Sequence, residues 1–234
     1  MNHIFPRPII IPLVVTTLLL NWYFIFIAHS FISLYYLFWL GGIGIFFLRY
    51  REKIVARLTN WNVHSSIKFI LIGYAAVLTE EFIVAFVHSL TEGFSLIGFG
   101  QLVFQFWAFN VFAFTGFIVG WYFLLKRFSY STADLFLIVG AWGLFSEHTL
   151  TYLGTNTLAA ILLILPTMST YNLIIAPAIA SISQFGERKI SWWKKYPLSF
   201  LILFTFSVVP VLLLGFLRLK FPGAFPPCEY IPCT

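Results

Sequence analysis

Apolar runs long enough to cross a lipid bilayer recur along the whole chain, and this repetition limits its fold more than any other feature. A transmembrane helix needs about 20 consecutive apolar residues. In lipid every backbone polar group must be bonded within the protein, which favours helices wherever the two-residue alternation of barrel strands is missing. The sequence therefore predicts an all-α transmembrane bundle with seven spans, near residues 8–28, 30–48, 67–90, 100–125, 133–154, 157–181 and 197–217.

The composition is that of a polytopic membrane protein. Of the 234 residues, 60% are hydrophobic and 9% are charged, and the mean hydropathy is +0.93. We expect one bundle over residues 1–220 and a tail over residues 221–234. The first run is too long for a signal peptide and lacks a small-residue cleavage site, so we interpret it as a retained span. Only His29 and Ser30 divide the first two spans, and residues 94–99 could form a short re-entrant segment.

The basic residues gather on one side of the predicted bundle. Twelve of the fourteen are Arg7, Arg49, Arg51, Lys53, Arg57, Lys68, Lys126, Arg127, Arg188, Lys189, Lys194 and Lys195. The positive-inside rule then places the N-terminus in the cytoplasm and the C-terminus outside the cell membrane, and only Arg218 and Lys220 dissent. The pI of about 9.4 follows from this topology and from contact with anionic lipid heads, so we expect the lipid bilayer as a partner and no nucleic acid.

The predicted tail is rich in proline and contains the two cysteines of the chain, Cys228 and Cys233. On the predicted topology the tail lies in an oxidising compartment, where a disulfide between them is allowed. A metal site is less favoured there, because the spacing is not that of a Cys-x-x-Cys pair and no histidine is near.

Two adjacent acids, Glu80 and Glu81, lie near the middle of the third predicted span. An acidic side chain at bilayer depth costs at least roughly 2.5–3.5 kcal/mol, so such residues usually face a bundle interior or a wet cavity and have a function. On a helix Glu81 shares a face with His88, whereas Glu80 points about 100° away. Only one acid of the pair therefore needs to face a site.

Further polar residues lie at a similar depth in the next two spans. They are Gln101, Gln105 and Asn110 on the fourth span and Glu147 and His148 on the fifth. If the spans alternate in direction, acids, amides and imidazole share the outer half of the membrane. Hydrogen bonding between helices could explain any one of these residues. Their coincidence in depth favours a functional site.

Several residues are explained by packing alone. Gly116 and Gly120 predict close helix contact on the fourth span, and Gly140 and Gly143 do so on the fifth. Asp134 follows Ser131 at the spacing of a helix N-terminal cap, so we interpret it as a capping acid. Prolines inside the last two spans predict kinks; they are Pro166, Pro177 and Pro210.

Three segments resemble, in order, the motifs of the CAAX-protease and PrsW superfamily of glutamic intramembrane proteases. They are Glu80-Glu81, Phe106-Trp107-Ala108-Phe109-Asn110 and Gly143-Leu144-Phe145-Ser146-Glu147-His148. The resemblance implies that one glutamate of the pair activates water, and that Asn110 and His148 polarise the substrate or bind an oxyanion. Glu147 with its flanking residues is similar to the PrsW glutamate segment.

The chain departs from the superfamily pattern at three places. Val84 or Ala85 stands where a basic residue follows the Glu pair, Asn110 stands where a histidine is expected, and Tyr152 stands where Asn or Asp follows the last histidine. The resemblance covers roughly residues 75 to 155. It is compatible with an active member and with a divergent or inactive one.

The chemistry of these residues leaves three classes of function open. A carboxylate withdrawn from water is a workable general base or acid, and His148, Asn110 or Gln105 could stabilise an oxyanion. The expected reaction is hydrolysis of a membrane-embedded peptide or lipid substrate, without a cofactor. Zinc is the variant, since ligand types suited to it occur at Glu81, His88, Glu147 and His148. The alternatives are a proton- or ion-coupled transporter and a non-catalytic bundle that binds lipid or a partner.

Overall fold

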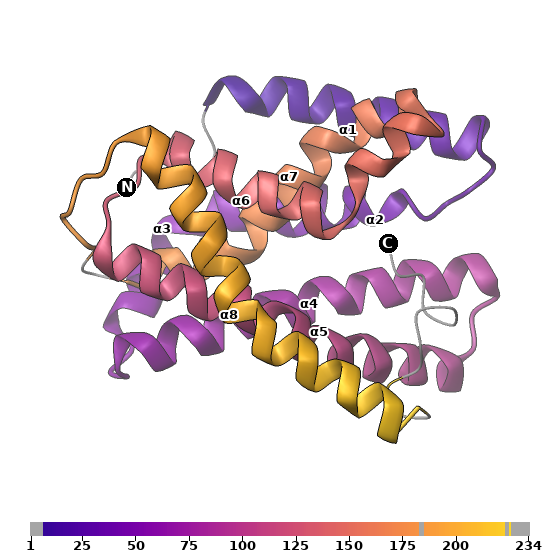
Figure 1. The fold of residues 1–234 in the computed structure, drawn as a ribbon. Helices are drawn as coiled ribbons and strands as arrows, with labels where there is room; N and C mark the ends of the chain where they lie inside the picture. Colours follow the sequence, from indigo (N-terminus) through magenta and orange to yellow (C-terminus); the bar gives the residue numbers. More distant parts are fainter. Residues whose placement is uncertain (1–6, 183–184, 223–224, 226–234) are drawn as a thin grey trace. The chain divides into compact units, whose positions relative to one another are not determined.

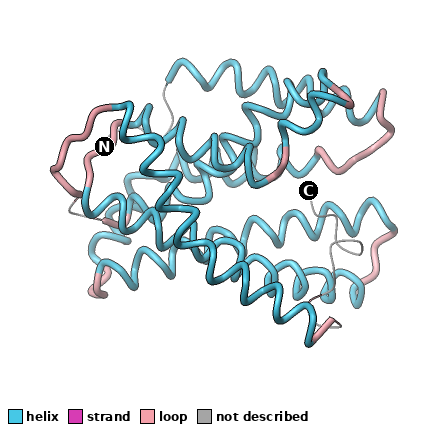
Figure 2. The backbone as a smooth tube through the Cα atoms, viewed as in Figure 1, coloured by secondary structure: helices cyan, strands magenta, loops and turns pink. Residues whose placement is uncertain are grey.

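The computed structural model describes residues 7–182, 185–222 and 225, and these residues form helices and connecting loops (Figures 1 and 2). Within this part of the chain, four helices are long and apolar enough to cross a membrane, which confirms the all-α membrane fold at this level. They are α4 (Ser65–Glu92), α5 (Leu96–Arg127), α7 (Thr157–Ala180) and α8 (Trp192–Lys220). Two shorter apolar helices are α1 (Ile10–Phe26) and α6 (Thr132–Ser146). The tail cysteines Cys228 and Cys233 lie outside the described residues, so the predicted disulfide stays a prediction.

The chain is organised as two compact units. The first unit runs to Asn60 and resumes over Tyr130–Ala176, and the second comprises Trp61–Ser129 and the chain from Pro177 onward. The first unit therefore contains α1, α6 and most of α7, and the second contains α4, α5 and α8.

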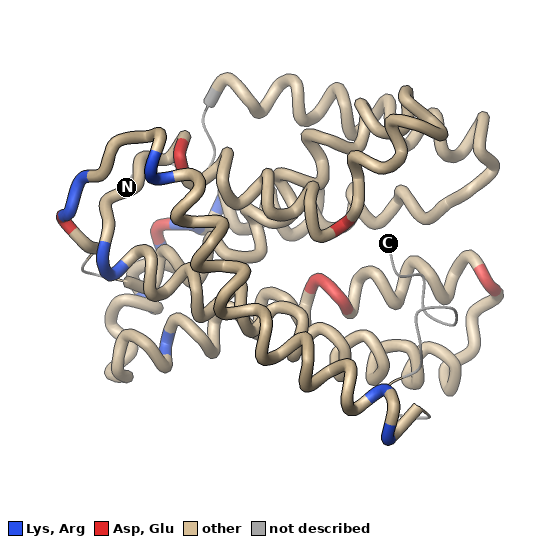
Figure 3. The backbone as a smooth tube through the Cα atoms, viewed as in Figure 1, with Lys and Arg blue, Asp and Glu red and all other residues tan. Residues whose placement is uncertain are grey.

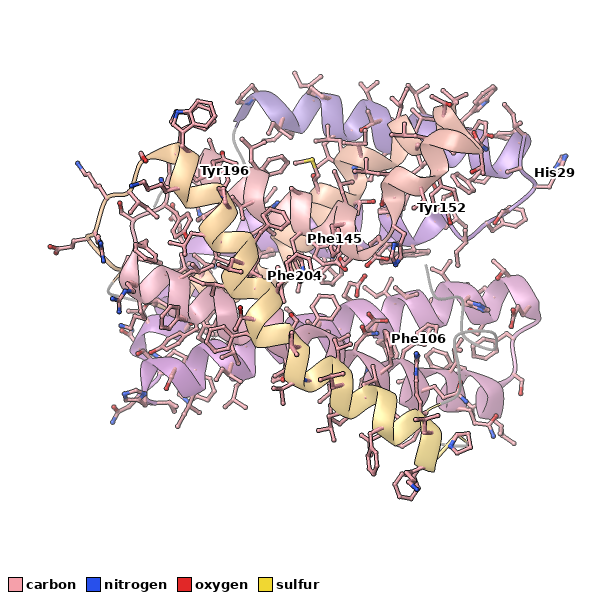
Figure 4. All side chains as sticks on the ribbon, viewed as in Figure 1. His29, Phe106, Phe145, Tyr152, Tyr196 and Phe204 are labelled. Carbon is pink, nitrogen blue, oxygen red and sulfur yellow. The ribbon has the colours of Figure 1, made fainter. Side chains whose placement is uncertain are left out.

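The first unit begins with α1 and a loop that ends it. His29 in this loop has a left-handed backbone (φ 51°), a conformation that interrupts a helix (labelled in Figure 4). Ser33 Oγ donates a hydrogen bond of 3.1 Å to Asn21 Oδ1 and so ties the loop back to α1. The division expected near His29 and Ser30 is confirmed.

The second helical segment extends well past its predicted end at residue 48. It comprises α2 (Leu34–Tyr36), a π-helical stretch (Leu37–Gly44) and α3 (Ile45–Asn60), which follow one another without a break. The sequence becomes charged after Tyr50 but keeps good helix formers such as Lys53 and Arg57. The end of the apolar run therefore marks the end of the candidate span and not the end of the helix.

The fifth predicted helix is shorter than the expected range of 133–154. Its beginning matches the prediction: Ser131 and Asp134 form a capping box, with the two hydrogen bonds at 2.9 and 3.1 Å. The helix ends at Ser146 because His148 adopts a left-handed backbone (φ 50°), after which residues Thr149–Gly154 form a 3₁₀ turn. The prediction of one continuous helix through residue 154 is wrong.

Helices α6 and α7 pack closely through the two glycines predicted for this role. A Cβ added to Gly140 would lie 2.6 Å from the Met168 side chain, and one added to Gly143 would lie 2.6 Å from the Tyr171 ring. Asn172 on α7 donates a 3.0 Å hydrogen bond to the carbonyl oxygen of Phe136 on α6. The glycines thus bring the two backbones near enough for polar side chains to bond across the interface.

In the second unit α4 and α5 form an antiparallel hairpin joined at Gly93, which has φ 95°. Tyr74 OH lies 2.5 Å from Thr115 Oγ1 at one level, and the Phe82 and Phe99 rings pack edge to face at 5.2 Å farther along. Residues 96–99 belong to the first turn of α5, so the re-entrant alternative is not found.

Helix α8 packs antiparallel on α5 over the predicted glycine face. A Cβ on Gly116 would lie 2.3 Å from the Cα of Ser207, and one on Gly120 would lie 2.9 Å from the end of the Leu203 side chain. The predicted close contact at these glycines is confirmed. It fixes α8 against the hairpin that contains Glu80 and Glu81.

Candidate functional site

The acid pair lies near the middle of α4. At about 1.5 Å per residue, Glu80 is roughly 22 Å from the start of the helix and 18 Å from its end. Both side chains are buried, with 6% of Glu80 and 9% of Glu81 exposed. The flanking residues Thr79 and Phe82 are exposed. A buried face of α4 therefore includes both acids, and which of them faces a site stays a prediction.

Helix α5 is fixed against α4 beside this pair. Trp107 Nε1 donates a 2.9 Å hydrogen bond to the carbonyl oxygen of Leu78, two residues before Glu80. A second tie lies one turn away, where Tyr74 OH is 3.4 Å from the carbonyl oxygen of Val111. These two ties set the register of α5 at the acid pair.

This register places the two predicted amides relative to the acids. Asn110 lies between the ties, which puts it roughly 5–10 Å along the helix axis from the acids, and it is 7% exposed. Gln105 lies on the other side of Trp107, at about the height of Glu80, and is half-buried, while Gln101 is exposed. The second unit thus supplies two buried carboxyl groups, a buried amide and a half-buried amide over a few helical turns.

His88 belongs to the end of α4 and not to the acid pair. It is seven residues from Glu81, which is about 10 Å along the helix. Its Nδ1 lies 3.4 Å from Oε2 of the exposed Glu92, and its ring meets the edge of Phe106 at 6.4 Å (Phe106 is labelled in Figure 4). The shared helical face predicted for Glu81 and His88 does not make them neighbours.

The first unit contains a polar network at the end of α6. Tyr171 OH on α7 donates a hydrogen bond to Glu147 Oε1, and Ser146 Oγ donates one of 2.8 Å to Tyr171 OH. Gly143 makes room for the tyrosine ring. Sequence reasoning missed Tyr171. The signal that could have found it is a three-residue spacing on both helices: Gly140, Gly143 and Ser146 on α6 face Met168 and Tyr171 on α7.

His148 lies beyond this network, in the turn that ends α6. It is exposed, its amide donates to the carbonyl oxygen of Phe145 at 3.2 Å, and its own carbonyl oxygen accepts from Thr151 Oγ1 at 2.6 Å. Its left-handed backbone turns it away from the helical path that Glu147 follows. The predicted role of His148 as an oxyanion-binding group stays a prediction.

The predicted site residues therefore divide between the two units. Glu80, Glu81, His88, Gln105 and Asn110 belong to the second unit, and Glu147 and His148 belong to the first. Their convergence on one site stays a prediction.

Metal ligands do not gather in the part of the chain that the structure describes: no group of three or more His, Cys, Asp or Glu side chains there could hold a metal ion. Comparison of the chain with protein-family models, with curated proteins and with solved structures finds no match. What the site does must be argued from its own residues.

Proposed function

We propose that this membrane protein is a hydrolase in which the buried acid pair of α4 activates water against a peptide bond of a membrane-embedded substrate. The observation that carries the proposal is the burial of both Glu80 and Glu81 in the middle of a helix long enough to span a bilayer. A purely structural lock between helices is made more cheaply by amides and hydroxyls, because carboxylates cost several kcal/mol at this depth.

The proposed reaction uses the two acids in different protonation states. One acid must accept a proton and the other must donate one, so the reaction needs one ionised and one protonated carboxyl. The ionised carboxylate takes a proton from water while the water oxygen bonds to the carbonyl carbon. The protonated acid then delivers its proton to the leaving nitrogen as the C–N bond breaks.

Neutral donors would stabilise the oxyanion formed in this reaction. The amide groups of Asn110 and Gln105 come from the helix packed against the acids, and amide N–H groups in a dry site stabilise developing negative charge without carrying charge themselves. The resemblance to glutamic intramembrane proteases agrees with this assignment at Glu80, Glu81 and Asn110. Since three positions depart from that pattern, we base the proposal on the acids.

The test compares Glu81→Gln and Glu80→Gln with Glu92→Gln, an exposed acid at the end of the same helix that serves as the matched control. Purified protein in lipid nanodiscs is incubated in H₂¹⁸O with a library of transmembrane peptides, and mass spectrometry detects new ¹⁸O-labelled carboxyl termini. We expect the parent and Glu92→Gln to cleave, and at least one pair variant to lose two orders of magnitude or more in rate.

Two results would contradict the proposal. One is a parent that cleaves no peptide of the library, and the other is cleavage that survives in the Glu80→Gln/Glu81→Gln double variant. Thermal unfolding of each variant, followed by circular dichroism, separates loss of chemistry from loss of fold.

Proton- or ion-coupled transport is the second candidate, and one observation in the first unit favours it. Beginning one residue after Pro166, α7 has a run of buried polar residues: Thr167, Ser169, Thr170 and Asn172. The hydroxyls of Ser169 and Thr170 have no hydrogen-bond partner among the described residues. Unpaired polar atoms next to a proline inside a membrane helix are typical of ion paths. Proton flux into proteoliposomes that Glu81→Gln abolishes, in the absence of peptide cleavage, would favour this function.

We further propose that the chain crosses the cell membrane seven times, with its N-terminus in the cytoplasm and its C-terminus outside. The second unit supports this orientation by itself (Figure 3). Seven basic residues of this unit lie where α4 and α8 begin and α5 ends: Lys68, Lys126, Arg127, Arg188, Lys189, Lys194 and Lys195. Arg218 and Lys220 lie at the other end of the unit. Arg218 packs over the Phe109 ring at 4.8 Å, which accounts for one of the two dissenting residues. Basic residues on one side mark the cytoplasmic face.

A further inference from the structure

Two tryptophans are exposed at the beginning of α8. Trp192 and Trp193 stack with ring centroids 3.9 Å apart, and 59% and 71% of their surfaces are exposed. Large exposed indole rings are unfavourable in water but are typical of the membrane–water interface, where the ring meets lipid and the N–H meets the headgroups. The start of α8 therefore has the chemistry of a headgroup-level surface.

The same tryptophans line a pocket. Trp192, Trp193, Tyr196 and Pro197 line an open surface pocket of about 400 Å³ (Tyr196 is labelled in Figure 4). These four residues belong to one stretch of α8, so the pocket lies wholly within the second unit. It is lined by aromatic and proline rings, which suit a ligand that has an apolar body and one polar end.

Basic residues lie next to the pocket residues along the chain. Lys194 follows the tryptophans directly and is exposed, and Arg188 and Lys189 are exposed on the loop that leads into α8. Glu187 is the one acid of this loop among the described residues. The excess of positive charge selects a ligand with a negative headgroup, because a phosphate accepts hydrogen bonds from Lys and Arg, whereas a cationic amine next to it would be repelled.

The basic loop is fixed and does not need to order itself around a ligand. Gly186 N donates a 2.8 Å hydrogen bond to the carbonyl oxygen of Leu125, and Ser129 N donates one of 3.1 Å to the carbonyl oxygen of Arg188. A Cβ on Gly186 would lie 2.3 Å from the backbone of Arg127. The loop is thus tied to the end of α5, whose Lys126 and Arg127 add to the same basic surface.

We propose that the start of α8 is a binding site for one anionic glycerophospholipid. Its phosphate and headgroup meet Lys194, Arg188 and Lys189, and its glycerol and upper acyl chains lie in the ring-lined pocket. Phosphatidylglycerol fits this description, because its headgroup carries a net negative charge and hydroxyls. Phosphatidylcholine fits it poorly, because its trimethylammonium group faces the same basic residues. This site is independent of the acid pair.

Native mass spectrometry of the full chain tests the site with phosphatidylglycerol and phosphatidylcholine of identical acyl chains. A Lys or Arg near an anionic surface contributes about 1 kcal/mol, which is roughly a fivefold change in affinity. We expect the parent to bind phosphatidylglycerol at least tenfold more tightly than phosphatidylcholine. Lys194→Gln should weaken phosphatidylglycerol binding about fivefold and leave phosphatidylcholine unchanged. Lys220→Gln, an exposed lysine at the other end of α8, is the matched control and should alter neither.

A pocket variant separates a built site from general charge attraction. Trp192→Leu keeps an apolar side chain but removes the stacked ring, so it should weaken both lipids in parallel while the unfolding temperature stays near that of the parent. Equal losses for Lys194→Gln and Lys220→Gln would overturn the proposal, as would a parent without preference between the two lipids. If Trp192→Leu does not fold, Trp192→Phe is measured in its place. We expect Trp192→Phe also to weaken the binding of both lipids, by a smaller factor.

Discussion

Replacing Gly116 by alanine tests whether α5 and α8 pack as closely as the structure has them. The added Cβ would lie 2.3 Å from the Cα and Oγ of Ser207 and 2.4 Å from its backbone nitrogen. Carbon atoms in contact prefer about 3.5–4.0 Å, so the helices must separate locally by roughly 1.2–1.7 Å. A rotamer change in Ser207 cannot relieve the clash, because two of the three close atoms belong to its backbone.

The expected change in the free energy of unfolding follows from two opposing effects. Overpacking costs about 1–3 kcal/mol and sometimes more, and a backbone obstacle favours the upper end of that range. Alanine regains about 0.5–1 kcal/mol over glycine inside a helix. We therefore expect Gly116→Ala to lower the free energy of unfolding by about 2 kcal/mol. For a soluble protein of this length that corresponds to a decrease in Tm of about 4–8 °C.

The assay is thermal unfolding of purified protein in one detergent, followed by far-ultraviolet circular dichroism. Gly215→Ala in α8 is the matched control, since nothing lies within 4 Å of its added Cβ, and its Tm should equal or exceed that of the parent. Gly120→Ala should fall between the two, because its nearest obstacle is the flexible end of Leu203 at 2.9 Å. A Gly116→Ala protein that unfolds at or above the parent temperature would refute the close packing of α5 on α8.

Two further predictions concern the first unit and the orientation of the second. Tyr171→Phe removes the hydroxyl that bonds Glu147 and Ser146, so it should destabilise the protein by about 1–3 kcal/mol. A double-mutant cycle with Glu147→Gln should give a coupling energy above about 0.5 kcal/mol. Additive losses of stability would contradict the network. In a background with serine at Cys228 and Cys233, a membrane-impermeant maleimide applied from the cytoplasm should label Ser191→Cys and leave Glu92→Cys unlabelled. The opposite pattern would invert the proposed topology.

The helices could be predicted from the sequence wherever hydropathy and capping residues decide them. The capping box at Ser131 and Asp134 and the glycine contacts of α5 and α6 were both predictable, because each rests on local chemistry at a fixed spacing. The end of α6 was not predictable. Apolar residues such as Leu150 and Leu153 recur after Ser146, whereas a single left-handed residue, His148, stops the helix.

The candidate site shows how far an argument from depth can reach. Matching positions along alternating spans fixes one coordinate of a side chain, its height in the membrane, and leaves open its rotation about the helix and the neighbours of that helix. Glu80, Glu81 and Gln105 lie at similar heights within the second unit, because α4 and α5 are consecutive and form one hairpin.

Whether Glu147 belongs to the same site stays a prediction. This acid lies in the other unit of the chain, and there it is hydrogen-bonded to Tyr171, a residue 24 positions later that height alone does not select. Burial of Glu80 and Glu81 likewise depends on the helices that pack around α4, which the sequence of α4 alone does not reveal. The role proposed for the acids of α4 rests on local structure, whereas a role for Glu147 in the same chemistry requires a measured coupling between Glu147→Gln and Glu81→Gln in the cleavage assay. If the two losses multiply independently, Glu147 acts only on the fold of the first unit; if the double variant is no slower than Glu81→Gln alone, the two acids serve one reaction.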